Sequence, residues 1–419
     1  MISYKDGILR LNFTSDIPDY LWGVSFFMLM LSVICFGSTT PGANYFYYFV
    51  FFLFIGTSLA LTLTQRIRTG KILFSLHTFW YGVFVLLALA SSIWADSFET
   101  AFVPLSKMVQ ILAVTYCLIL HLDSEERLEQ YIRIVLAASA FMVVYIFVKT
   151  PVEQWFSGFL GVVTSYNSND VGCALTIAVL FSFYEAYVKR RKGFYLACLP
   201  FFFVVILTSS RKALFMSVLG VLMMVTFNYR ARNYILRVLC ALLAGILAVV
   251  LIYRVPYLYQ TVGVRLDNMI EFLFSDHTNK ANIDYSLTLR RFYIDMAKSF
   301  FAERPLFGIG LNNFSYRILE YGRSFTYAHN NYWEIAADLG IVGFITYYWF
   351  YAYLFVKLVR QMLDGHKTAL LFISVLLLFI IFEYGMVNYY KMQVHLVLAA
   401  AFCAVSLNDA GASQEANTP

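Results

Sequence analysis

Residues 253–333 form the one long polar interval of a chain that is otherwise mostly apolar. His329 lies at the end of this interval and opens the motif HNNYWEIAADLGIVG. A neutral imidazole accepts a proton near pH 7, so His329 is a candidate general base or, alternatively, a phosphate ligand. A lone histidine is more often structural, but its place where a loop meets a helix favours a functional role. Asn330 or Asn331 is expected to cap that helix.

An arginine in a short turn supplies the second candidate. Arg211 and Lys212 follow two serines in LTSSRKALF, with apolar sequence on both sides. A basic residue at the outer end of a membrane helix runs against the orientation rule and is costly inside the bilayer. One interpretation is an arginine that only reaches the interface. We favour an anion-binding arginine, because guanidinium groups bind phosphates in a bidentate manner.

The segment VVTSYNSNDVG (162–172) carries a run of polar side chains just before an apolar stretch. These side chains, Asn169 among them, could cap the following helix and satisfy its free amide groups. They could instead form a polar lip at a helix N-terminus, where an anion is favoured. In that second interpretation Tyr166 and Asn169 belong to a substrate site.

The polar interval itself is expected to contain a helix over residues 286–304, which lies on the bundle or on the membrane face. An apolar stripe at helical spacing predicts this helix. The stripe consists of Leu289, Phe292, Met296 and Phe300. Pro305 is expected to end the helix, and Gly308 and Gly310 to let the next segment pack flat. Farther on, Gly340 and Gly343 have a spacing that favours close helix contact.

The composition identifies the class of protein. Apolar residues make up 60% of the 419 residues and charged residues only 13%, whereas soluble proteins have about a quarter charged. The chain is therefore predicted to be a polytopic membrane protein. The net charge of +6 is explained by orientation and by contact with anionic lipids, so no nucleic acid partner is expected.

Apolar runs of membrane-spanning length, about 20 residues, occur about twelve times. They are 20–36, 43–63, 74–93, 101–120, 130–148, 170–188, 194–208, 213–228, 235–252, 333–356, 368–384 and 392–407. The seventh run is short and Lys107 interrupts the fourth, so eleven spans is the alternative count.

Lysine and arginine set the direction of these spans, because they gather in short cytoplasmic segments. With the N-terminus inside, most of them fall in inner segments such as KRRK (189–192). The short outer segments hold only Lys149, Arg211, Lys212 and Lys391.

The predicted fold is thus an all-α polytopic membrane protein, with one transmembrane domain over residues 1–419. Residues 253–333 form a long, partly helical periplasmic loop between the ninth and tenth spans. Both termini are cytoplasmic, and residues 408–419 are expected to be a disordered tail.

Three motifs, in this order, resemble those of the O-antigen ligase and O-antigen polymerase superfamily of bacterial membrane glycosyltransferases. They are SSRKAL, the stretch from Arg290 to Pro305 that runs into LFGIGLNNF, and HNNYWEIAADLGIVG. The plan of about twelve spans, with a long outer loop before the tenth, is similar as well. The resemblance covers roughly residues 160–350.

This resemblance implies a metal-independent, inverting glycosyltransferase that needs no cofactor. It would move a glycan from an undecaprenyl diphosphate carrier to an acceptor sugar on the outer side of the inner membrane. The family's catalytic residues fall on Arg211, Arg290 and His329, with Arg291 as the alternative to Arg290. The residues expected to bind substrate are Arg291, Lys212, Asn330, Asn169 and Tyr166.

Two enzymatic functions share these motifs. A polymerase joins repeat units of O-antigen or capsule type, and a ligase moves the glycan to lipid A-core. We favour the polymerase, because richness in Tyr and Phe suits a groove for sugar and lipid. A flippase or exporter of lipid-linked oligosaccharide, or a scaffold, is the alternative of another class; the lack of an internal repeat argues against transport. Expected partners are the lipid-linked donor, the acceptor, membrane lipids and polysaccharide-assembly proteins.

Overall fold

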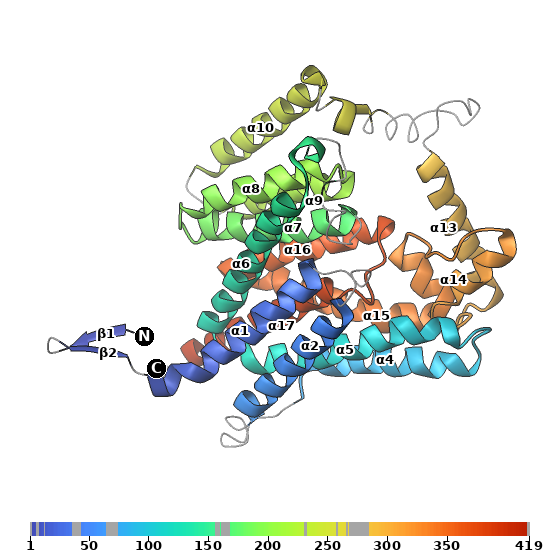
Figure 1. The fold of residues 1–419 in the computed structure, drawn as a ribbon, viewed down its shortest axis with the longest axis horizontal. Coiled ribbons are helices and arrows are strands. Elements are labelled where there is room, and N and C mark those ends of the chain that lie inside the picture. The colour runs from blue at the N-terminus through green and yellow to red at the C-terminus, as the bar shows by residue number, and fades with distance from the viewer. Residues whose placement is uncertain are drawn as a thin grey trace.

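The computed structural model describes residues 2–5, 8–11, 13–35, 43–63, 74–155, 160, 168–229, 233–256, 259–264, 267 and 285–416. A short antiparallel hairpin of β1 (Ile2–Lys5) and β2 (Ile8–Leu11) precedes a bundle of helices (Figure 1). Apart from this hairpin, the regular structure of the described residues is helical, as the apolar runs predict.

The first half of the bundle consists of α1 (Phe13–Cys35), α2 (Ala43–Ser58), α4 (Leu76–Ala90), α5 (Glu99–His121), α6 (Glu125–Lys149) and α7 (Ser168–Phe183). The second half consists of α8 (Phe194–Leu207), α9 (Arg211–Phe227), α10 (Tyr234–Arg254), α15 (Asn331–Asp364), α16 (Lys367–Phe382) and α17 (Met392–Ala416). Between α10 and α15 lie α13 (Tyr285–Glu303) and α14 (Asn313–Arg317).

Eight helices in the described part of the chain are long and apolar enough to cross a membrane. They are Leu76–Ile93, Glu99–His121, Glu125–Lys149, Ser168–Val188, Tyr234–Arg254, Asn331–Asp364, Lys367–Gly385 and Met392–Ala410. The remaining predicted runs fall on three shorter apolar helices, Tyr20–Cys35, Tyr45–Leu61 and Phe194–Leu207, and on α9. A total of about twelve crossings therefore stays a prediction.

Two segments of the chain differ in helical extent from the sequence prediction. The predicted disordered tail begins at residue 408, whereas α17 continues as a helix to Ala416. In the middle of the chain, Lys107 does not break its apolar run, because α5 is continuous through it. A lysine side chain can extend its charged end toward a polar cavity while its stem packs among apolar groups.

Side-chain caps define where several helices begin. Ser124 starts α6 by accepting a hydrogen bond from the Arg127 amide at 3.3 Å. In the same way, Asn330 starts α15 by accepting one from the Trp333 amide at 3.1 Å. Of the two asparagines predicted as caps for this helix, the cap is therefore Asn330. Such bonds matter most in a membrane protein, since lipid offers free amide groups no partner.

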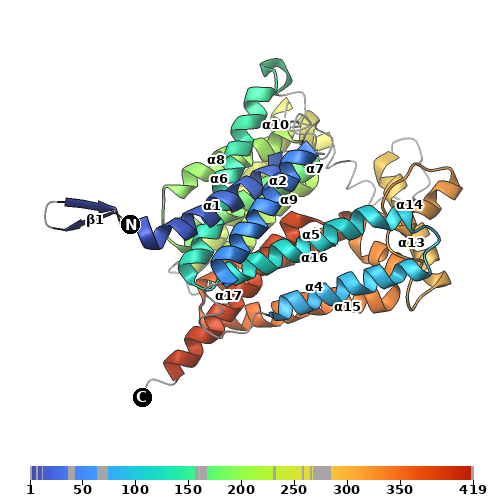
Figure 2. The ribbon, with the colours of Figure 1, turned by 60° about the horizontal axis from the view of Figure 1, so that its bottom comes forward.

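The helix α13 lies against the end of the bundle, beside α14 and the first turns of α15 (Figures 1 and 2). Its predicted apolar stripe packs into a separate small core, in which Phe300 is fully buried and Leu289, Phe292 and Met296 are partly buried. The prediction of an amphipathic helix on the bundle is therefore confirmed.

A break in α15 anchors the segment that follows α13. Gly340 has φ 66° and ψ −167°, so it leaves helical geometry inside α15. The amide of Ile341 donates to the carbonyl of Pro305 at 2.8 Å, and the amide of Gly310 donates to that of Asp338 at 2.8 Å. A Cβ at Gly340 would overlap the Leu306 carbonyl. The close contact of Gly340 is thus with this loop, and the prediction of a helix–helix contact is wrong.

Candidate functional site

A cavity of about 820 Å³ lies where many helix ends meet. Its wall comes from the C-terminal ends of α1 and α16 and from the N-terminal parts of α2, α5, α7, α9 and α17. The N-terminal part of α13, the segment before α15 and the loop between α16 and α17 complete it. The orientation rule predicts all of these helix ends on the outer side.

This cavity gathers candidates that lie far apart in sequence. The predicted residues in its wall are Asn169, Lys212, Arg290 and His329. The other described candidates, Arg211, Arg291 and Asn330, are not among its lining residues. Tyr166 lies outside the described residues. Arg211 is half-buried at the first position of α9, and Arg291 is exposed on α13.

His329 occupies a constrained position beside aromatic rings. Its φ of 58° is in the left-handed region, which non-glycine residues seldom adopt. The ring of Tyr327 lies 4.2 Å from the His329 ring, and that of Tyr293 lies 5.8 Å away, measured between centroids. Burial, followed by the charges of Arg290 and Lys212, lowers the pKa of His329 to about 4. The imidazole is therefore neutral at pH 7.

Two side chains at the start of α15 hold the backbone on either side of His329. Asn330 caps the helix from the position directly after the histidine. Glu334 is fully buried, and its Oε2 accepts a hydrogen bond from the amide of Ala328, directly before the histidine, at 2.6 Å. These two bonds keep the backbone in its unusual conformation, and so they position the imidazole at the cavity.

Asn331 connects α15 to the loop between α16 and α17. Its Oδ1 accepts hydrogen bonds from the amides of Asn388 at 2.8 Å and Tyr389 at 3.2 Å. Its Nδ2 donates to the carboxyl group of Glu383 at 3.1 Å and to the Tyr348 hydroxyl at 2.8 Å. The loop that forms one wall of the cavity is therefore held to the helix that follows His329.

The turn that precedes α9 packs closely against α7. The Ser210 hydroxyl donates to Asn169 Oδ1 at 2.7 Å. A Cβ at Gly172 would lie only 2.7 Å from that of Ala213, so the two segments touch at a glycine. Lys212 extends from this turn to the carbonyl of Gly385, to which its Nζ donates a hydrogen bond. These contacts place the Lys212 ammonium in the cavity wall.

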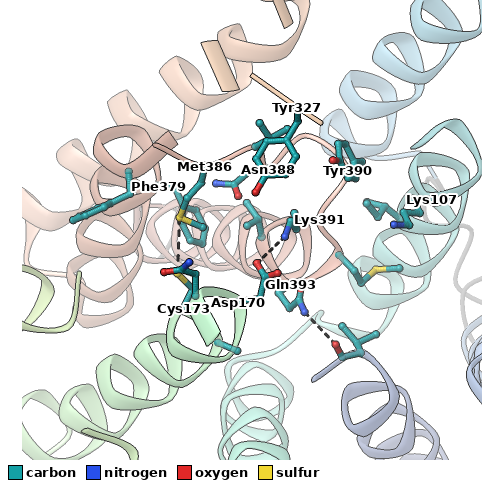
Figure 3. A pocket seen from close by; sticks show the side chains of 18 of the residues that line it. Lys107, Asp170, Cys173, Tyr327, Phe379, Met386, Asn388, Tyr390, Lys391 and Gln393 are labelled. Carbon is teal, nitrogen blue, oxygen red and sulfur yellow. Dashed lines mark hydrogen bonds and ion pairs between the residues drawn. The ribbon is translucent and has the colours of Figure 1, made fainter. Parts of the chain in front are cut away.

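Sequence reasoning did not assign Lys391 and Lys107 to the site, and it included Asp170 only as part of the polar segment 162–172. All three line the cavity, and Figure 3 shows Lys391 and Asp170 directed at each other. Lys391 Nζ lies 2.7 Å from Asp170 Oδ1, and Lys107 Nζ lies 5.7 Å from the centre of the Tyr390 ring. Burial alone would lower the pKa of Lys391, but the Asp170 carboxylate outweighs it and raises that pKa.

A signal for both lysines was present in the sequence. Lys391 is one of the few basic residues in a predicted outer segment, and Lys107 interrupts an apolar run. A basic residue in an outer segment conflicts with the orientation rule, and a charge inside an apolar run is costly in the bilayer. The same argument identified Arg211 as a candidate.

The cationic side chains of this wall suit an anionic ligand, and its aromatic side chains suit a neutral ligand group that carries hydroxyls, such as a sugar. Cationic side chains come from α5, α9, α13 and the loop before α17, and Asp170 is the one carboxylate among the lining residues. Aromatic rings, which stack on sugars and contact lipid, come from Tyr327 and Tyr390. Among the described residues, no group of three or more His, Cys, Asp or Glu side chains could hold a metal ion.

Part of the chain matches a known protein family. The family model described as O-antigen ligase matches residues 196–348. This region extends from α8 into α15 and includes Lys212, Arg290 and His329. A search of curated proteins finds no significant match.

Proposed function

We propose that this multi-pass bacterial membrane protein, whose residues 196–348 match the O-antigen ligase family model, is a glycosyltransferase of the O-antigen ligase and polymerase superfamily. The protein transfers a glycan from undecaprenyl diphosphate to the hydroxyl group of an acceptor sugar, and it joins repeat units of O-antigen or capsule type. The reaction takes place on the outer face of the inner membrane, with both termini of the chain in the cytoplasm.

The observation that carries this proposal is the meeting of Lys212, Arg290 and His329 in one cavity. These residues come from α9, α13 and the segment before α15, so their proximity is a product of folding. A sugar diphosphate already has a good leaving group, and its enzyme mainly needs cations to bind and neutralise it. A cavity of about 820 Å³ is within the size range of small-molecule sites.

In the proposed mechanism, Arg290 and Lys212 bind the diphosphate of the donor. His329 accepts the proton of the acceptor hydroxyl as its oxygen attacks the anomeric carbon. The bond from that carbon to the phosphate oxygen breaks on the opposite side, so the configuration inverts. Undecaprenyl diphosphate leaves with the electron pair, and its added charge is neutralised by the two cations.

The lowered pKa of His329 bears on this role. A free imidazole with a pKa of about 4 is neutral but weakly basic at pH 7. Binding of the anionic donor offsets the charges of Arg290 and Lys212, so it raises the pKa of His329 and makes it a better base. The alternative is that His329 binds the phosphate directly, in which case its protonated form is the active one.

Arg211 remains part of the proposal beside its neighbour Lys212. The resemblance assigns the turn cation to Arg211, whereas Lys212 is the residue that lines the cavity. The two positions differ by one residue at the start of α9, and single substitutions distinguish them. Asn169 is proposed to bind substrate from the cavity wall. Asn330, Arg291 and Tyr166 stay proposed substrate-binding residues on the sequence alone.

The test of the enzymatic function is glycan transfer by the purified full chain in detergent, with a lipid-linked repeat unit as donor. We expect transfer by the wild-type protein and none by His329→Ala or Arg290→Gln. A flippase would show no transfer under these conditions, since it moves a lipid-linked glycan without forming a glycosidic bond. As a matched control, Lys298→Met removes an exposed cation of α13 and should leave transfer unchanged.

The choice between polymerase and ligase is tested in cells. Deletion of a polymerase leaves lipid A-core that carries a single repeat unit, whereas deletion of a ligase leaves core without any glycan. We expect the single-unit product on a gel of the lipopolysaccharide. Core without any glycan would assign the chain to the ligase alternative.

A further inference from the structure

We infer that the Asp170 carboxylate pairs with Lys391 until the donor binds. The donor's diphosphate then takes the place of this carboxylate and binds the Lys391 ammonium. The inference rests on the proposed function and adds to it a cationic ligand from the loop before α17. It also assigns a role to the one carboxylate among the lining residues of the cavity.

The geometry of the pair is the first support. Lys391 Nζ and Asp170 Oδ1 are 2.7 Å apart, and the two residues are separated by 221 positions in sequence. Both line the cavity, with side chains that are 32% and 35% exposed. A pair that faces a cavity and is this accessible can be reached by an anion that enters it. Figure 3 shows the pair in the middle of the cavity wall.

The charge balance of the cavity wall favours exchange. Its cationic residues are Lys107, Lys212, Arg290 and Lys391, against the single carboxylate of Asp170. A sugar diphosphate brings two ionised phosphates, so it can contact more than one cation of the cavity wall at once. Arg290 and Lys212 interact electrostatically with His329, Lys212 also interacts with Lys391, and Lys107 lies over the Tyr390 ring. The cations of the wall therefore surround a shared space that also includes the Lys391–Asp170 pair.

The position of Asp170 lowers the free-energy cost of separating its carboxylate from Lys391. Asp170 lies in the first turn of α7, where the helix dipole stabilises a negative charge. Its carboxylate therefore keeps a favourable electrostatic partner in the helix dipole when Lys391 turns to a stronger anion. Lys391, in turn, is kept at the cavity by the hydrogen bonds that two amides of its loop donate to Asn331 Oδ1. After transfer, the carboxylate recaptures the ammonium and so promotes release of the lipid diphosphate.

Binding of farnesyl diphosphate to the purified full chain tests this exchange. We expect Lys391→Met to weaken binding by about tenfold or more, because a charged hydrogen bond is lost. Asp170→Asn should strengthen it by up to about fivefold and slow dissociation, because a competing ion pair is removed. Lys391→Arg should retain binding, which shows that charge is required and that the loop still folds. Lys298→Met, in an ion pair outside the cavity, is the matched control.

The outcomes separate this inference from the proposed function. If Asp170→Asn weakens binding as much as Lys391→Met, the pair is only structural and the inference fails. If Arg290→Gln weakens binding while neither member of the pair matters, the inference fails and the proposed function stands. If neither Arg290→Gln nor His329→Ala affects binding or transfer, the proposed function itself fails. Equal binding of phosphatidylglycerol would identify a general headgroup site and overturn the exchange.

Discussion

Glu334 Oε2 accepts a hydrogen bond of 2.6 Å from the amide of Ala328, the residue directly before His329. The carboxyl group is fully buried and comes from the first turn of α15. It thus holds the backbone on one side of the histidine while the Asn330 cap holds the other. These two contacts at the start of α15 together position His329.

The first prediction concerns this contact. Glu334→Ala leaves a buried amide without its acceptor, so we expect a loss of stability of about 1–3 kcal/mol together with a loss of glycan transfer. Glu334→Gln keeps an acceptor oxygen and should restore most of the transfer. Transfer rates and thermal unfolding of both purified variants provide the measurement. If Glu334→Ala transfers glycan as fast as Glu334→Gln and the wild-type protein, the contact does not position His329.

The second prediction is a pH dependence. With His329 as the base, kcat/KM for the donor should fall only near pH 4, the pKa of the free enzyme. The acid limb of kcat should lie at higher pH, because the bound diphosphate raises the pKa of His329. Arg290→Gln removes a charge that lowers this pKa, so the pKa of His329, measured by titration of the imidazole and not by turnover, should also move upward. A rate that increases as the pH falls would instead support His329 as a protonated phosphate ligand.

The third prediction compares two neighbouring cations. Lys212 lines the cavity and donates to the Gly385 carbonyl, while Arg211 is not in the lining. We expect Lys212→Met to weaken farnesyl diphosphate binding by about tenfold or more. Arg211→Met should have a smaller effect on binding. If only Arg211→Met abolishes transfer, the turn arginine is the functional cation, as the family resemblance implies.

The fourth prediction addresses the break in α15. Gly340→Ala forces a left-handed backbone and a clash with the Leu306 carbonyl, so we expect a cost of more than about 2 kcal/mol. Gly322 also has a positive φ, of 67°, but a Cβ added there would meet no atom within 4 Å. Gly322→Ala should therefore cost only about 1 kcal/mol. Unfolding temperatures of the two purified variants should differ in that order.

The fifth prediction tests orientation. Single cysteines at Lys149 and Lys192 are introduced into a chain whose native cysteines are replaced by alanine, because Cys240 is exposed. An impermeant maleimide should label Lys149→Cys in intact spheroplasts, since that position is predicted on the outer side. Lys192→Cys, in the inner KRRK segment, should be labelled only after lysis. The reverse pattern would place the cavity on the cytoplasmic side.

Local sequence was sufficient to place α13 and the start of α15, although α17 continues past its predicted end. The stripe of Leu289, Phe292, Met296 and Phe300 predicted α13, because helical periodicity depends only on neighbours in the chain. Asn330 was one of the two predicted caps for the same reason. The contact of Gly340 was assigned to the wrong partner, since a glycine permits a close approach without specifying what approaches.

By itself, the sequence determined that this is an apolar helical chain with His329, Arg290 and the Arg211–Lys212 turn as candidates, because hydrophobicity, charge and motif order are local properties. The tertiary structure alone decided that Lys212, Arg290 and His329 share a cavity with Lys391 and Asp170. It also decided that Glu334 holds the segment before α15, and Asn331 the loop before α17, in their places at the cavity wall. Such contacts join residues that are distant along the chain, and only the packing of the helices fixes which of them meet.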